Sequence, residues 1–268
     1  MLYAAKLRLL KTPWGDALWR RWHAARGDDV GHADRLPEFI RRYASGRTFV
    51  DIGSLWRVDG EHAFIAEAAG ATAVKAVDVY GPTPTFEAKK QARNSAVEFI
   101  LGDAGRAETI TRVGVTDVVF CSGVLYHHPS PFNLLVALRR MCGQILILRT
   151  STIPEFGDIP QAAVYFPLLG PQDRRVWSLD FSGRLVQCGI STEFRPEEGY
   201  GNWFWGLTPS CVAALLQTAG FRIDHQAPEP LAHTFFCSPI MPPFDHPLPD
   251  EATARTLPIG RPAPADDR

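Results

Sequence analysis

A chain of 268 residues is long enough for one large α/β domain with additions. Its 46% hydrophobic and 21% charged residues exclude a mostly disordered chain, and no apolar stretch reaches the length of a transmembrane helix. A net charge of -1 gives no global attraction to nucleic acid or to anionic membranes, so binding of that kind would require a local patch.

The cysteine pattern favours a reduced protein. The five cysteines are scattered, odd in number and without a C-x-x-C pair: Cys121, Cys142, Cys188, Cys211 and Cys237. Buried thiols fit this pattern better than disulfides or a zinc site, so no metal is expected. The N-terminus lacks the long apolar core and the cleavage site of a signal peptide. We therefore expect a cytoplasmic protein.

Residues 1–45 are expected to form a helical cap. Pro13 and Gly15 predict a break between two helices, and a third helix is predicted near 34–43. The apolar and the basic side chains of this region include Leu7, Leu10, Leu18, Trp19, Trp22, Lys6, Arg8, Lys11, Arg20, Arg21 and Arg26. Two interpretations fit: a cap packed on the domain, or a basic lid that meets an anionic substrate, nucleic acid or lipid surface.

From residue 46 to 238 the pattern predicts a single domain built on a sheet. Short apolar strands are predicted at 47–52, 73–79, 97–101, 116–121 and 144–149. Helices are predicted between them at 61–69, 86–93, 107–112 and 130–141, the last with Ser130 as its cap and Pro131 in its first turn. This alternation is typical of an α/β fold with a doubly wound, mostly parallel sheet.

Residues 151–206 interrupt the alternation. They are rich in Pro, Gly and aromatic residues, and 184–188 has a strand-like pattern. An insertion at this place is expected to shape a substrate pocket. A helix at 208–219 and strands at 221–224 and 233–237 follow. The segment 239–268 holds eight prolines and is expected to be a disordered or surface-hugging tail.

Polar residues stand at the ends of four successive predicted strands. Asp51 closes the first, Asp78 closes the second, Asp103 follows the third after a glycine, and Ser122 follows the fourth. The carboxyl ends of parallel strands lie side by side, where ligands bind. An acid after the second strand can accept both ribose hydroxyls of a nucleoside, and one after the third suits an adenine amino group. Each acid alone could also be a helix cap.

Together these residues resemble the class I methyltransferases that depend on S-adenosyl-L-methionine (SAM), over roughly residues 47–237. The run G-V-L-Y-H at 123–127 resembles the branch with the tRNA wobble-uridine carboxymethyltransferases and related small-molecule methyltransferases. The resemblance implies a seven-stranded Rossmann-like sheet with a reversed last strand, and S-adenosyl-L-homocysteine (SAH) as product. The cofactor residues that it implies are Asp51, Gly53, Ser54, Trp56, Gly60, Asp78, Val79, Asp103, Ala104 and Ser122.

The loop after the first strand departs from that family's pattern. Two or three glycines usually follow the first acid, whereas here Ser54, Leu55 and Arg57 stand between Gly53 and Gly60. Glycine lets backbone approach a ligand closely, so Arg57 could narrow the site. An arginine could also pair with an extra carboxylate on a modified SAM, or point to solvent.

His127 is the candidate catalytic base, because it follows the fourth strand and has an ordinary pKa near neutrality. The residues expected at the substrate are Tyr126, His127, Arg149, Trp203 and Trp205. The aromatic residues could instead pack the insertion on the sheet, and Arg149 could pair with a neighbouring acid. Adjacent histidines point apart, which disfavours a metal site at His127 and His128.

Three functions follow from these patterns. The first is a methyltransferase that acts on an O or N atom of a small molecule, favoured by the aromatic insertion and the near-neutral charge. The second is a tRNA-modifying (carboxy)methyltransferase that uses the basic N-terminal helices. The third is a non-catalytic subunit that binds SAM or SAH, suggested by the altered glycine loop. The oligomeric state is not predicted.

Overall fold

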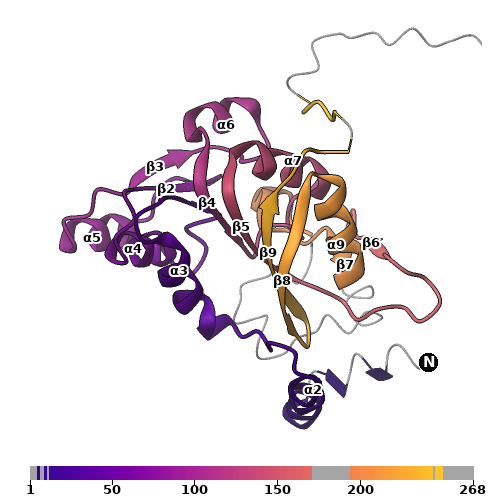
Figure 1. Cartoon of the computed structure of the whole chain (residues 1–268). Helices are drawn as coiled ribbons and strands as arrows, with labels where there is room; N and C mark the ends of the chain where they lie inside the picture. The colour runs from indigo at the N-terminus through magenta and orange to yellow at the C-terminus, as the bar shows by residue number, and fades with distance from the viewer. Residues whose placement is uncertain (1–4, 7–8, 11, 171–193, 244, 250–268) are drawn as a thin grey trace, which may run out of the picture.

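The computed structural model describes residues 5–6, 9–10, 12–170, 194–243 and 245–249. Seven strands form one sheet in the order β3-β2-β1-β4-β5-β9-β8 (Figure 1). The strands are β1 Thr48–Ile52, β2 Ala73–Asp78, β3 Glu98–Leu101, β4 Thr116–Ser122, β5 Cys142–Ser151, β8 Phe221–Glu229 and β9 Ala232–Pro239. Strands β1 to β5 are parallel, and β9 is antiparallel to both β5 and β8. The expected mostly parallel sheet with a reversed last strand is confirmed.

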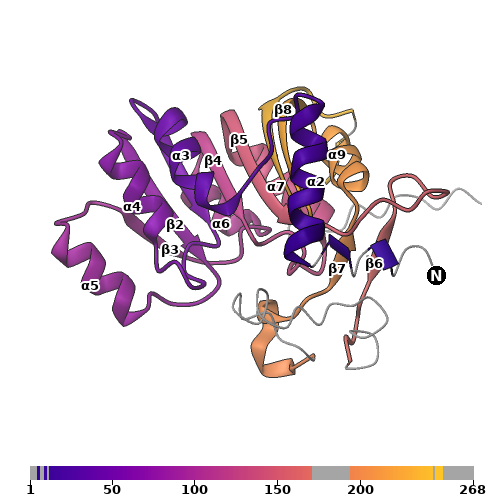
Figure 2. The ribbon, with the colours of Figure 1, turned by 90° about the horizontal axis from the view of Figure 1, so that it is seen from below.

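Helices cover both faces of the sheet (Figure 2). They are α3 Leu36–Ala44, α4 Glu61–Ala68, α5 Pro84–Ala92, α6 Ala107–Val113, α7 Pro131–Met141 and α9 Pro209–Thr218, whereas α2 Pro13–Ala25 contributes to neither apolar core of the sheet. One apolar core joins the sheet to α3, α4 and Phe86 of α5. The other joins the opposite face to α6, α7 and α9. Burial on both faces explains why the strands read as continuous apolar runs.

Side-chain caps begin several helices, as their sequences indicate. The hydroxyls of Thr83 and Thr208 accept hydrogen bonds from backbone N–H groups in the first turns of α5 and α9. The expected cap at α7 is incomplete, since Pro131 begins that helix but Ser130 makes no side-chain hydrogen bond to it. Pro131 pre-sets the first helical φ, which supports a helix start without a hydroxyl.

Of the two residues expected to break the helix, Pro13 does begin a new helix, but Gly15 does not end one. Pro13 starts α2, and Gly15 lies inside it, where a Cβ atom would clash with the carbonyl oxygen of Leu9. Gly15 therefore allows the preceding chain to cross the helix closely rather than ending it. The third helix begins with a 3₁₀ turn, η1 Ala33–Arg35, and continues as α3.

The insertion is anchored by a two-stranded sheet. Strand β6 Ala163–Tyr165 pairs antiparallel with β7 Trp205–Leu207, and a 3₁₀ helix, η2 Pro196–Gly201, precedes β7. The strand-like pattern at 184–188 lies outside the described residues. In the tail, Leu248 is buried against the core, and His246 hydrogen-bonds Asn133 of α7. No helix among the described residues is both long and apolar enough to cross a membrane.

Candidate functional site

A cavity of about 400 Å³ lies at the carboxyl ends of the parallel strands. Its wall takes residues from the ends of β1 to β5, from the loop after β1, and from η2. Ten of the residues singled out from the sequence line it: Gly53, Trp56, Asp78, Val79, Asp103, Ala104, Ser122, Tyr126, His127 and Arg149. The volume is typical of a pocket for a small molecule or cofactor.

Asp78 joins the β1 loop to the end of β2. One carboxylate oxygen accepts a hydrogen bond from the Leu55 backbone N–H at 2.9 Å, and the other accepts one from the Tyr80 N–H at 3.0 Å. Burial raises the pKa of Asp78, against the lowering effect of these bonds. A carboxylate offers about four acceptor positions, so each oxygen can still accept a hydroxyl donor from the cavity.

Asp103 holds the insertion over the end of β3. Its carboxylate accepts hydrogen bonds from the Tyr200 hydroxyl at 2.6 Å and from the Gly105 N–H at 2.8 Å. His128 Nε2 lies 3.5 Å from the same carboxylate, and the His128 ring stacks on Tyr200. Burial alone would raise the pKa of Asp103, but these donors outweigh it and hold the pKa at about 2. Asp103 is therefore a carboxylate at neutral pH.

Asp51, Ser54 and Gly60 lie behind the cavity wall. Asp51 Oδ2 and Ser54 Oγ are buried without a hydrogen-bond partner among the described residues. Burial, together with the charge of Asp78, raises the pKa of Asp51 to about 8. Gly60 has φ 76° and begins α4 against the ring of Phe86, which a Cβ atom would meet at 2.5 Å. These three residues support the strand end and the loop after β1 from behind and do not line the cavity.

His127 is fixed by the insertion. Its Nδ1–H donates to the Asn202 carbonyl at 2.8 Å, which leaves Nε2 as the unprotonated nitrogen. Burial lowers the pKa of His127 to about 4, although the bond to Asn202 opposes that shift. The imidazole is therefore neutral at physiological pH.

The two candidate tryptophans do not line the cavity. Trp203 is buried against the ring of Tyr126, with ring centroids 4.4 Å apart. Trp205 Nε1 donates to the Pro129 carbonyl, and the backbone carbonyl of Tyr126 accepts the N–H groups of Phe204 and Trp205. Both indoles thus pack the insertion on the loop after β4, whereas the alternative expected from the sequence was packing on the sheet itself.

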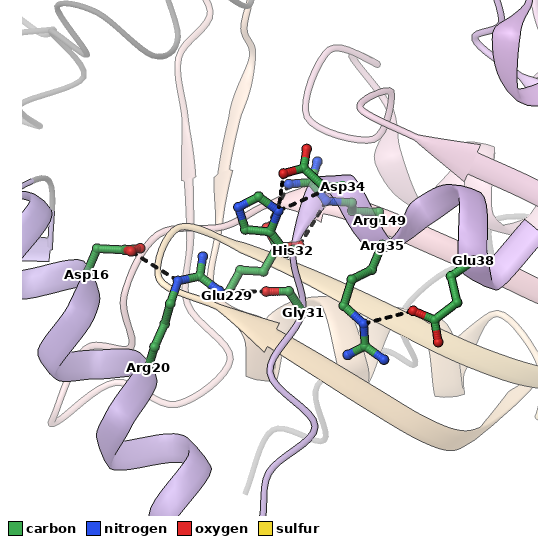
Figure 3. Close-up of polar contacts among 9 residues, drawn as sticks. All are labelled: Asp16, Arg20, Gly31, His32, Asp34, Arg35, Glu38, Arg149 and Glu229. Carbon is green, nitrogen blue, oxygen red and sulfur yellow. Dashed lines mark hydrogen bonds and ion pairs between the residues drawn. The ribbon is translucent and has the colours of Figure 1, made fainter.

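Arg149 enters the cavity from β5 and pairs with Glu229 at the end of β8. The pair is bidentate, with N–O distances of 2.9 and 2.8 Å. Figure 3 shows the pair beside the segment that carries Gly31. The Gly31 N–H donates to the Pro228 carbonyl, and a Cβ atom on Gly31 would meet Glu229 Cγ at 3.1 Å. The segment before α3 therefore packs directly on the pair.

Several cavity residues were not singled out from the sequence. His62 lines the cavity from the first turn of α4. Burial lowers its pKa to about 4; the charge of Glu61 raises the pKa and that of Arg149 lowers it further. Its position two residues after Gly60 is the feature of the sequence that could have identified it. Tyr80 depends on a long-range contact, because its hydroxyl donates to the Glu198 carbonyl of η2. No local pattern indicates such a contact.

We expect the free energy of unfolding to fall as the pH is lowered from about 6.5 to about 4. Burial lowers the pKa values of His62, His127 and His233 to about 4, so the unfolded chain takes up these protons at higher pH than the native state. Each contributes about 1.4 kcal/mol per pH unit within that window. Asp51 and Asp78 oppose them, because burial raises the pKa of both carboxyl groups and the native state therefore takes up these protons at higher pH than the unfolded chain. Urea unfolding across this range measures the slope.

His233→Gln is the control for that slope. His233 lies in β9 outside the cavity wall and hydrogen-bonds the Gln226 side chain. Removing it should reduce the slope by about 1.4 kcal/mol per pH unit. An unchanged slope would show that His233 titrates normally in the native protein.

No family model matches the chain. A tRNA U34 carboxymethyltransferase of Shewanella frigidimarina (strain NCIMB 400) is 32% identical over 178 residues. The matched region is 60% of this chain and 47% of that protein, so the chain spans about half the length of this relative.

Solved structures are similar over most of the chain. The N-terminal domain of EvdMO1 with SAH bound has a TM-score of 0.51 and 18% identity, and the match covers 78% of this chain and 80% of that domain. A 1,6-didemethyltoxoflavin-N1-methyltransferase of Burkholderia thailandensis has a TM-score of 0.51 and 16% identity, and the match covers 89% of each chain. An O-methyltransferase family protein of the same organism has a TM-score of 0.54 and 13% identity. That match covers 78% of this chain and 56% of the other protein. With the observed sheet order, these likenesses show that the chain has the fold of the class I SAM-dependent methyltransferases.

Proposed function

We propose that this protein is a SAM-dependent methyltransferase that transfers a methyl group to an O or N atom of a small-molecule acceptor. The observation that carries the proposal is the placement of Asp78 and Asp103. They stand at the ends of neighbouring strands and line one cavity together with Gly53 and Ser122. The likeness to methyltransferase structures, two of them named with SAH bound, supports the same assignment.

The residues of the cavity fit SAM. Asp78 keeps acceptor positions for the two ribose hydroxyls, and the ionised Asp103, with Ala104, suits the adenine amino group. Gly53 has φ 77°, and its missing side chain leaves room at Val124. We assign the methionine part of SAM to the Gly53 side of the cavity. SAM supplies a methyl group already activated on a sulfonium, so the protein has mainly to position it.

The protein's own groups would handle the acceptor and its proton. Tyr126, His127 and Arg149 line the cavity beyond Ser122 and are the proposed acceptor-binding residues. An acceptor O–H or N–H would pass its proton to His127 Nε2, which the bond from Nδ1–H to Asn202 keeps unprotonated. With a pKa of about 4, the resulting imidazolium would release that proton readily to solvent.

Calorimetric titration with SAM and SAH, followed by transfer assays, tests the proposal. We expect both to bind, and a pool of phenols, amines and carboxylic acids to yield a product heavier by one methylene unit. His127→Asn should lower the transfer rate and leave SAM affinity unchanged. Absence of binding by either nucleoside would contradict the proposal, whereas binding without transfer to any acceptor would favour a non-catalytic SAM-binding subunit.

The 32% identical tRNA U34 carboxymethyltransferase supports a second candidate, a tRNA-modifying (carboxy)methyltransferase. In that case Arg57, which lines the cavity, would face a carboxylated cofactor. Salt-dependent binding of bulk tRNA, with a modified nucleoside in the digested RNA, would favour this candidate.

We assign the reaction to the cytoplasm. The described cysteines Cys121, Cys142, Cys211 and Cys237 are buried free thiols, as expected in a reducing compartment.

A further inference from the structure

Helix α2 carries an apolar stripe on its exposed face. Trp14, Leu18 and Trp22 are spaced four residues apart, so they lie in one row along the helix. They are 68%, 50% and 54% exposed. Large apolar side chains gathered in such a row mark an interaction surface more often than single exposed ones do. On the other side of α2, Trp19 packs on His23 of the same helix, and Arg20 bonds Asp16 of the same helix and the Gly31 carbonyl of the following segment.

Positive charge flanks this stripe on both sides. At 100° per residue, Arg21 projects just before Trp14 around the helix, and Arg26 just after Trp22. Arg21 and Arg26 are exposed, and the Arg26 guanidinium lies 4.6 Å from the Trp22 ring centroid. An apolar row between two arginines is the pattern of a helix that lies in a membrane interface.

The charge of the chain is divided unequally. The first 26 residues contain six Lys and Arg and one acid, Asp16. The whole chain has 28 Lys and Arg and 29 Asp and Glu, so the rest of the protein is net acidic. An anionic surface would therefore attract the N-terminal region and repel the remainder, which orients the molecule with α2 toward that surface.

The position of α2 relates the stripe to the cavity. The chain after α2 is fixed to the end of β8 by the hydrogen bond from the Gly31 N–H to the Pro228 carbonyl. The β8–β9 turn lies at the carboxyl end of β5, where the Leu231 carbonyl accepts the Thr152 N–H. Figures 1 and 2 place α2 beside this turn. The stripe and the cavity are therefore at the same edge of the sheet.

We propose that α2 docks this protein on the surface of an anionic lipid bilayer, through Trp14, Leu18 and Trp22 with Arg21 and Arg26 at the headgroups. Leu18 decides between a bilayer and RNA, because a leucine in the middle of the row buries in acyl chains but cannot stack on a base. Indoles suit the boundary between acyl chains and headgroups, where an apolar ring and a polar N–H are both accommodated.

Sedimentation with vesicles tests this proposal without SAM or an acceptor, so its result is separate from that of the proposed methyl transfer. The full chain should sediment with vesicles of phosphatidylserine and phosphatidylcholine, and much less with phosphatidylcholine alone. Trp14→Ser with Trp22→Ser should weaken binding about tenfold or more, and Arg21→Gln with Arg26→Gln should weaken it by about tenfold. Val115→Ser, which changes a 75% exposed side chain between α6 and β4, is the matched control and should bind as the parent does.

Circular dichroism and the melting temperature should be the same for all four proteins, because every changed side chain is exposed. Failure to bind anionic vesicles, or equal binding to neutral ones, would overturn the proposal. It would also be overturned if the Trp14 and Trp22 changes left vesicle binding intact. The same holds if these changes abolished tRNA binding or self-association and not vesicle binding.

Discussion

Replacing Asp78 with alanine should weaken SAM binding by about 1–3 kcal/mol, or about 5- to 150-fold in Kd. Two charge-assisted hydrogen bonds to the ribose would be lost. The Leu55 N–H and Tyr80 N–H would also lose their acceptor, which loosens the loop after β1. Isothermal titration of the variant with SAM and with SAH measures the effect, and both ligands should be affected alike because they share the ribose.

Asp117→Ala is the matched control for this variant. Asp117 also accepts a backbone N–H, that of Thr48 at 2.9 Å, together with the Thr48 hydroxyl, but at the amino ends of β1 and β4. Its loss should lower stability and leave SAM affinity unchanged. If Asp78→Ala bound SAM as tightly as Asp117→Ala does, the assignment of β2 to the ribose would be wrong.

The sheet could be predicted because its strands are buried on both faces and separated by capped helices. Five of them read as short apolar runs from Phe49 to Leu148, and their alternation with helices fixes parallel pairing. The boundaries differ where packing extends a strand. Strand β8 continues to Glu229, beyond the expected end at 224, because β9 pairs with it along its whole length.

The cavity was predictable where the strand ends and the loop motifs that follow them determine it. Asp78, Asp103 and Ser122 follow from counting strands, since neighbouring strands bring their carboxyl ends together. The residues that cover the cavity follow from tertiary contacts that cross 97 to 118 positions in the chain, such as Tyr200 to Asp103 and Tyr80 to Glu198. No periodic pattern in one sequence encodes a pairing at that distance.

The loop from Gly53 to Gly60 shows the limit of a motif. Missing glycines suggested a narrower or altered site, yet Arg57 and Asp59 themselves adopt positive φ, 58° and 45°. Such a conformation costs a non-glycine residue about 1–2 kcal/mol. Two hydrogen bonds hold the loop there: Asp78 accepts one from the Leu55 N–H, and the Thr83 hydroxyl donates one to the Asp59 carboxylate. Tertiary hydrogen bonds thus replace the glycines.

Glu229→Gln should lower the free energy of unfolding by about 3 kcal/mol, the lower end of the range for breaking a buried ion pair. The Arg149 guanidinium would keep its charge without its bidentate partner, in a site where the two side chains are only 20% and 7% exposed. The segment that packs on Glu229 through Gly31 would be loosened as well. Urea unfolding at neutral pH, followed by circular dichroism, measures the loss.

The double variant Arg149→Met with Glu229→Leu distinguishes a charge effect from a packing effect. Removing both charges leaves no unpaired ion, so the double variant should be more stable than Glu229→Leu or Arg149→Met alone. Additive losses would instead mean that the two side chains act independently, through packing.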